Sequence, residues 1–155
     1  MDIEHNVEKI IIENIELLNY DKVLFFFRDK INVLKVSNNY NGKNQIDYNI
    51  INNFLENIES QPNIYGILTK FPNETNWKLH YIGQRKSKDI KQRLYQHLIK
   101  KHQNTGAQLD KVNIELMKEK EIGIKLMSIL PDELRHYYEE RLLKDIDSLD
   151  WNIQK

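Results

Sequence analysis

Two short apolar runs, separated by a turn-rich segment, follow Pro62 and constrain the fold of this chain more than any other feature. They span 64–68 and 78–83, and residues 71–76 between them include the proline and asparagine that are typical of turns. Apolar runs bounded by turn residues favour strands. The pair therefore predicts an antiparallel hairpin.

Downstream of this hairpin the apolar spacing changes from that of strands to that of helices. Pro131 fits the first turn of a helix, where its missing N–H costs no hydrogen bond. The predicted elements are helices over 88–101 and 107–119, a third strand over 123–130 and a last helix from 131 to about 148. The order strand, strand, helix, helix, strand, helix predicts an α+β fold in which helices flank a small three-stranded antiparallel sheet.

The first 60 residues are interpreted as an N-terminal extension, with helices and strands, of a domain over 61–155. Residues 22–36 fit either two strands or one helix capped by Asp21, and their β-branched and aromatic content favours strands. The other predicted elements are a helix over 3–18, a loop over 37–44 and a helix from the N-cap residue Asp47 to 60.

Length and composition exclude several classes of protein. The chain has 155 residues and no cysteine, which excludes disulfide scaffolds, cysteine zinc sites and a cysteine nucleophile. Its acidic N-terminus lacks the basic and apolar regions of a signal peptide, and no apolar run approaches the ~20 residues that span a bilayer. We therefore expect a soluble, cytoplasmic protein with no membrane partner.

Charge is unevenly distributed along the chain. The net charge of zero argues against bulk binding of nucleic acid, but residues 61–130 carry a net charge of +7 between acidic flanks. Seven basic residues lie within 85–101 against one acid. Such a cluster is either a solvated helix face or the footprint of a polyanion. With Arg93 set aside, the DNA-binding candidates are Arg85, Lys86, Lys88, Lys91, Lys100 and Lys101.

Several polar residues occupy positions that a purely structural element would not require. Tyr65 and Tyr81 lie on the two hairpin strands, where they can be neighbours. Arg93 and His97 are four residues apart in a helix, on the face that carries apolar residues, so they should point toward the sheet. His80 alternates with Tyr81 and is expected on the opposite face of its strand.

Glu139 shares the apolar stripe of the last helix with Leu142 and Leu143. A carboxylate in that position is costly unless it has a cation or a metal as partner. Glu140 points about 100° away around the helix and is interpreted as solvated, although it remains the alternative carboxylate.

These residues occur in an order that resembles the motifs of the GIY-YIG nuclease superfamily. The matching segments are Asn63-Ile64-Tyr65, Tyr81-Ile82-Gly83, Arg93-x-x-x-His97, Glu139-x-x-Leu142-Leu143, and Asn152 after Trp151. The predicted order of elements is also that of the GIY-YIG fold, and the resemblance covers residues 62–155. Two departures are Asn63, where the family usually has glycine, and a longer gap between the two tyrosines.

The resemblance implies a metal-dependent endonuclease that hydrolyses phosphodiester bonds in double-stranded DNA, and its restriction branch adds the expectation of site-specific cleavage of the type II kind. It implies that Glu139 holds Mg²⁺ (or Mn²⁺), that Arg93 binds the scissile phosphate, and that Asn152 closes the domain and ties the C-terminus to the site. Tyr65 is the candidate general base, while Tyr81 and His97 position water or relay the proton. Which of these three takes the proton stays open.

Two other functions are weighed against the nuclease. One is a catalytically inactive nucleic-acid-binding module on the same fold, and the other is a structural protein, which leaves the basic 85–101 segment unexplained. The extension over 1–60 can complete the core, contact DNA or form a dimer surface. A homodimer is a hypothesis, since two sites related by a two-fold axis cut both strands most simply.

Overall fold

A computed structural model describes residues 19–58, 61–102 and 106–152. The helix expected over 3–18 lies outside these residues. The helices and strands are α2 (Tyr20–Arg28), β1 (Leu34–Lys35), β2 (Ser37–Tyr40), β3 (Lys43–Ile46), α3 (Tyr48–Glu56), β4 (Ile64–Lys70), β5 (Lys78–Gln84), η2 (Ser87–Asp89), α4 (Ile90–Leu98), α5 (Leu109–Met117), β6 (Glu121–Met127), η3 (Asp132–Leu134) and α6 (Arg135–Asp145). Within the described ranges, every helix is too short or too polar to cross a membrane.

The main sheet has four antiparallel strands in the order β1-β6-β4-β5. The predicted α+β class and the antiparallel hairpin of β4 with β5 are confirmed, but the prediction of three strands is wrong. The fourth strand, β1, has only two residues, with Leu34 opposite Ile124. A strand this short has no periodicity of its own, and pairing with the free side of β6 defines it.

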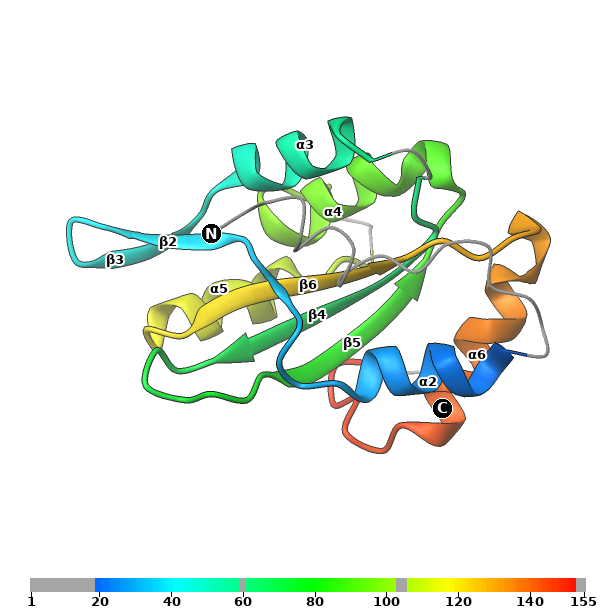
Figure 1. The fold of residues 1–155 in the computed structure, drawn as a ribbon. Coiled ribbons are helices and arrows are strands. Elements are labelled where there is room, and N and C mark those ends of the chain that lie inside the picture. The colour runs from blue at the N-terminus through cyan, green and yellow to red at the C-terminus, as the bar shows by residue number, and fades with distance from the viewer. Residues whose placement is uncertain (1–18, 59–60, 103–105, 153–155) are drawn as a thin grey trace.

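Helices cover both faces of this sheet (Figure 1). On one face, α3, α4 and α5 pack on strand residues that include Tyr65, Ile67 and Leu126. On the other face, α2 and α6 pack on alternate residues such as Ile64 and Leu68. Because both faces are buried, β4 is apolar almost throughout.

The aromatic run at 23–27 forms part of α2, so the preference for a strand there is wrong. Val23, Phe26 and Phe27 are buried while Phe25 is exposed, which is the pattern of one helix face. Contacts with the sheet and α6 outweigh the strand preference of these residue types. Asp47 is the N-cap of α3, as predicted, and its carboxylate accepts a hydrogen bond from the Asn49 N–H at 3.1 Å.

The expected loop over 37–44 is instead a two-stranded hairpin, β2–β3, that extends beyond the main sheet (Figure 1). Its turn residues Asn41 and Gly42 have φ of 55° and 84°. Two successive positive φ angles at Asn-Gly are typical of the tight turn that matches the twist of paired strands. The asparagine-rich composition concealed this turn signal.

An irregularity in β5 changes the expected direction of His80. Ile67 lies opposite Tyr81 and Leu68 opposite Leu79, so His80 is an extra residue in the ladder. Such a bulge interrupts the alternation of side chains. His80 stacks on Trp151, which belongs to the same core as Tyr81. The expectation that His80 points away from the Tyr81 face is therefore wrong.

Candidate active site

Tyr65 of β4, Tyr81 of β5 and His97 of α4 form one aromatic cluster. The ring centroids are 6.2 Å apart for the two tyrosines, 5.4 Å for Tyr65 and His97, and 5.2 Å for Tyr81 and His97. The tyrosines are diagonal neighbours, because the register pairs Tyr65 with Gly83. The structure therefore brings these three predicted residues together.

Gly83 leaves the space that the Tyr65 side chain occupies. A Cβ atom at position 83 would lie 2.4 Å from the Tyr65 hydroxyl oxygen and 2.5 Å from its Cζ. Tyr65 is buried, so its ring has little room to move aside. Gly83 of the Tyr81-Ile82-Gly83 motif is therefore needed to make room for the Tyr65 ring on the neighbouring strand.

We expect Gly83→Ala to destabilise the protein by about 2 kcal/mol, which is typical of overpacking a tight interior. Urea unfolding measures this loss. Gly42→Ala is the comparison, because its added methyl group meets no atom within 4 Å and the strain there comes from its backbone angle alone. Equal stability of Gly83→Ala and wild type would contradict the packing argument.

The hydrogen bonds of His97 define its tautomer. Its Nδ1 accepts the backbone N–H of Gln108 at 2.9 Å, and its Nε2 lies 2.8 Å from the Tyr65 hydroxyl oxygen. Burial, and then the charges of Arg93 and Arg85, lower the pKa of His97 to about 3. A neutral imidazole whose Nδ1 accepts must carry its proton on Nε2. His97 therefore donates to Tyr65 and is not a proton acceptor in this arrangement.

Arg93 is buried beside Tyr65, although it carries a permanent charge. Its Nη1 donates to Gln96 at 3.0 Å, but within the described part of the chain its Nε has no hydrogen-bond partner. A buried guanidinium N–H without an acceptor is costly. The arrangement suits an anion with two oxygens, because the planar guanidinium can bind both.

Two opposing influences act on the Tyr65 hydroxyl. Burial, and then the neighbouring Tyr81, raise the pKa of Tyr65 above its usual value, while Arg93 and Arg85 lower it. Tyr65 is therefore protonated at neutral pH in the free protein. The donors and cations around its oxygen would stabilise a phenolate once the proton has left.

Glu139 lies half-buried on α6. Burial, and then the charge of Glu140, raise its pKa to about 7, and Arg85 opposes this shift. Across the described ranges, no side chain forms a hydrogen bond or an ion pair with its carboxylate. An oxygen ligand without a partner fits a divalent cation such as Mg²⁺. Glu140 is exposed, as expected.

No three histidine or acidic residues gather around a common point in the part of the chain that the structure describes. A cation at Glu139 would therefore need water and substrate oxygens to complete its coordination shell, which is common for Mg²⁺.

Arg85 has a larger place in the site than the sequence indicated. Its charge acts on Tyr65, His97 and Glu139, in addition to the DNA-binding role expected for it. Its position directly after the Tyr81-Ile82-Gly83 strand was the available signal. Of the other basic candidates, Lys86, Lys88, Lys91 and Lys100 are exposed. Lys101 is half-buried and paired with Asp110 at 2.9 Å.

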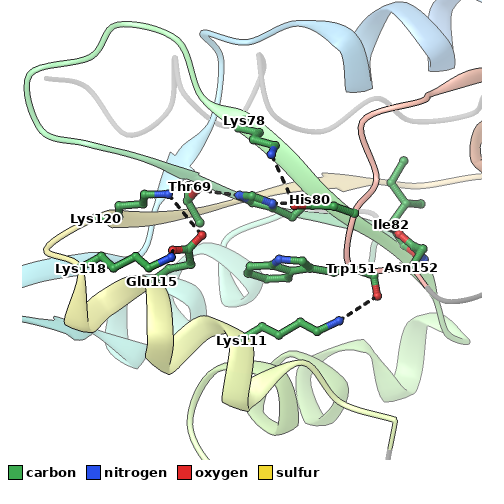
Figure 2. Close-up of polar contacts among 11 residues, drawn as sticks. Thr69, Lys78, His80, Ile82, Lys111, Glu115, Lys118, Lys120, Trp151 and Asn152 are labelled. Atoms are coloured by element: carbon green, nitrogen blue, oxygen red, sulfur yellow. Dashed lines mark hydrogen bonds and ion pairs between the residues drawn. The ribbon is translucent and has the colours of Figure 1, made fainter.

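Trp151 and Asn152 fasten the segment after α6 to β5 (Figure 2). The Asn152 side chain accepts the Ile82 N–H at 3.1 Å and donates to the Ile82 carbonyl at 2.9 Å, and the Trp151 N–H donates to the His80 carbonyl. Asn152 is therefore bonded to the β5 backbone at Ile82, between the site residues Tyr81 and Gly83, and it can affect the site only by holding that backbone.

A second hydrogen-bonded chain lies beside this attachment. His80 bonds the Thr69 hydroxyl at 2.8 Å and the Asp150 carboxylate at 2.7 Å. The order of groups is that of a hydrolase triad. Thr69 and His80 are, however, each only 2% exposed, so a substrate cannot reach the hydroxyl. These hydrogen bonds hold residues 150–152 against β5.

Comparisons of the whole sequence with models of protein families, with curated proteins and with solved structures find no significant match.

Proposed function

We propose that this chain is a metal-dependent endonuclease that hydrolyses phosphodiester bonds in double-stranded DNA, with a site of the GIY-YIG type. The observation that carries the proposal is Arg93, a buried cation whose Nε has no acceptor among the described residues, beside the bonded pair of Tyr65 and His97. A phosphate diester supplies the anion that such a donor lacks. The exposed lysines of 86–100 supply favourable charge for the flanking phosphates.

Each residue has a role in this proposal. Arg93 binds the scissile phosphate and stabilises the charge that grows on it. Tyr65 first loses its hydroxyl proton to solvent, and the Nε2–H of His97 and the charge of Arg93 stabilise the resulting phenolate. The phenolate oxygen then accepts the proton of the attacking water and returns to the neutral phenol. Glu139 would hold Mg²⁺ or Mn²⁺, which, when bound, supplies Lewis-acid stabilisation of the phosphate and of the leaving oxygen. Tyr81 orients the water.

The test uses supercoiled plasmid and linear duplexes with Mg²⁺, and EDTA as the metal-free control. We expect nicked and linear products with wild type only when Mg²⁺ is present. Arg93→Ala and Glu139→Ala should each lower the rate by at least about 100-fold, the usual cost of removing one group that stabilises a transition state. Arg141→Ala is the matched basic control, since Arg141 stacks on Tyr20, 3.7 Å from the ring centroid, outside the site.

DNA binding without cleavage across a broad panel of duplexes would favour the inactive binding module. Unchanged cleavage in both site variants would contradict the assignment of the site. Discrete product bands, as opposed to a smear, would support site-specific cleavage of the restriction type. Sedimentation with and without DNA tests the homodimer, for which the exposed Phe25 on α2 is the first contact to examine.

A further inference from the structure

Asn63 occupies the position at which the GIY-YIG motif usually has glycine, and it is almost completely buried. Its backbone extends both ladders of β4. The N–H donates to the Met127 carbonyl at 2.9 Å, and the carbonyl accepts the Arg85 N–H at 3.0 Å. Asn63 therefore already links β6 to the start of the segment that carries Arg85.

The side chain of Asn63 adds a second set of bonds that glycine cannot make. Its Oδ1 accepts the Ile129 N–H at 2.8 Å, and its Nδ2 donates to the Ile129 carbonyl at 2.9 Å. The Nδ2 group also donates to the Asp132 carboxylate at 3.0 Å. The amide thus pairs with Ile129 as a further backbone residue would, and holds the segment that leads into α6.

These bonds continue into a ring that three side-chain contacts and the backbone pairing of β4 with β5 close. Arg135, the first residue of α6, donates through Nη1 to the second oxygen of Asp132 and through Nε to Gln84 at 2.8 Å. Gln84 ends β5 and lies opposite Ile64, which follows Asn63. The ring of Asn63, Asp132, Arg135 and Gln84 therefore ties the ends of β4 and β5 to the start of α6.

Three of the four ring members lie close in sequence to a residue of the proposed site. Tyr65 comes two residues after Asn63, Arg85 follows Gln84, and Glu139 lies four residues after Arg135. In an α-helix, four residues are about one turn, or about 6 Å. Movement at Arg135 is therefore transmitted almost directly to the Glu139 carboxylate.

We infer that Asn63 and Arg135 are positioning residues, which hold α6 so that the Glu139 carboxylate meets a divalent cation at the proposed site. The inference rests on the proposed function. Residues that orient a metal ligand typically change metal affinity by about 10–100-fold when they are replaced. A ring with only a structural role would change stability and leave metal affinity alone.

The test measures Mn²⁺ binding by electron paramagnetic resonance, with Tyr65→Phe protein bound to a short DNA duplex so that cleavage is slow on the time scale of the measurement. Adding Arg135→Met should weaken Mn²⁺ binding about tenfold. It opens the ring but preserves the buried bonds of Asn63 to Ile129. Arg141→Met is the matched control on the same helix and should leave Mn²⁺ affinity unchanged. A thermal melt establishes that both variants are folded.

Asn63→Gly, which restores the family residue, should weaken Mn²⁺ binding by a similar factor and also lower the melting temperature. The Arg135 variant keeps the test informative if Asn63→Gly does not fold. Equal Mn²⁺ affinity with and without Arg135, or an equal loss with Arg141→Met, would overturn the inference. A parent complex that binds DNA but no Mn²⁺ would overturn the metal site of the proposed function instead.

Discussion

Tyr65→Phe is expected to lower the rate of DNA cleavage by about 1,000-fold, within the range that general acid–base groups contribute. The substitution removes the oxygen that receives the His97 Nε2–H and on which Arg93 and Arg85 act. The phenyl ring still fills the space over Gly83, so the fold should be retained. The buried Nε2–H loses its acceptor, at a cost of about 1–3 kcal/mol. Single-turnover cleavage at saturating Mg²⁺ measures the effect.

Tyr81→Phe is the matched comparison. Tyr81 is half-buried in the same cluster. The His97 Nε2–H at 2.8 Å and the charges of the two arginines act on the Tyr65 hydroxyl, however. We expect a loss of only about tenfold. DNA affinity, measured with Ca²⁺ in place of Mg²⁺, should be the same for both variants. A larger loss for Tyr81→Phe would give the role of general base to Tyr81.

The elements after residue 61 were predictable because each has a strong local pattern. Strands β4 and β5 are apolar runs separated by turn residues, and α4 repeats apolar residues at helical spacing. The earlier elements depend on contacts distant in sequence. The helix α2 packs against α6, whereas β1 lies within residues 22–36, for which strands were favoured, and its pairing is with β6. Local preference alone therefore assigned residues 23–27 to a strand.

The same contrast holds for the candidate site. The spacing of Arg93 and His97 placed both on the face toward the sheet, and both are buried there. The partner that defines the His97 tautomer is a backbone N–H eleven residues away, at Gln108, which no side-chain pattern signals. Lys125 is a further example, buried on β6 with its Nζ bonded to the Phe26 carbonyl. Backbone donors and acceptors from other elements leave no trace in the periodicity of the sequence.

His97 should make the stability of the fold depend on pH. Its pKa is about 3 in the folded protein and 6.5 in the unfolded chain. Below pH 6.5 the unfolded chain therefore binds a proton that the folded protein does not, and stability falls as the pH falls. Between pH 7 and pH 4 the loss is about 3 kcal/mol, at 1.36 kcal/mol for each pKa unit crossed.

Glu139 acts in the opposite sense over the same range. Its pKa is about 7 in the folded protein against 4.5, so the folded protein binds the extra proton and stability rises as the pH falls from 7 toward 4.5. Wild type should consequently show a shallow dependence. The fall in stability due to His97 should therefore be seen in Glu139→Gln and should be absent from the double variant Glu139→Gln/His97→Gln. All other titrating groups, including His80, are the same in these two proteins, so the difference between them reports His97 alone.

Urea unfolding of the two proteins at several pH values measures this difference. Nuclear magnetic resonance of the His97 ring in wild type is an independent check, because the imidazole should remain neutral down to pH 4. Equal pH slopes in the single and double variants, or titration of His97 near pH 6.5, would mean that solvent reaches the imidazole. His97 could then accept the proton of the attacking water, and the donor role toward Tyr65 would be withdrawn.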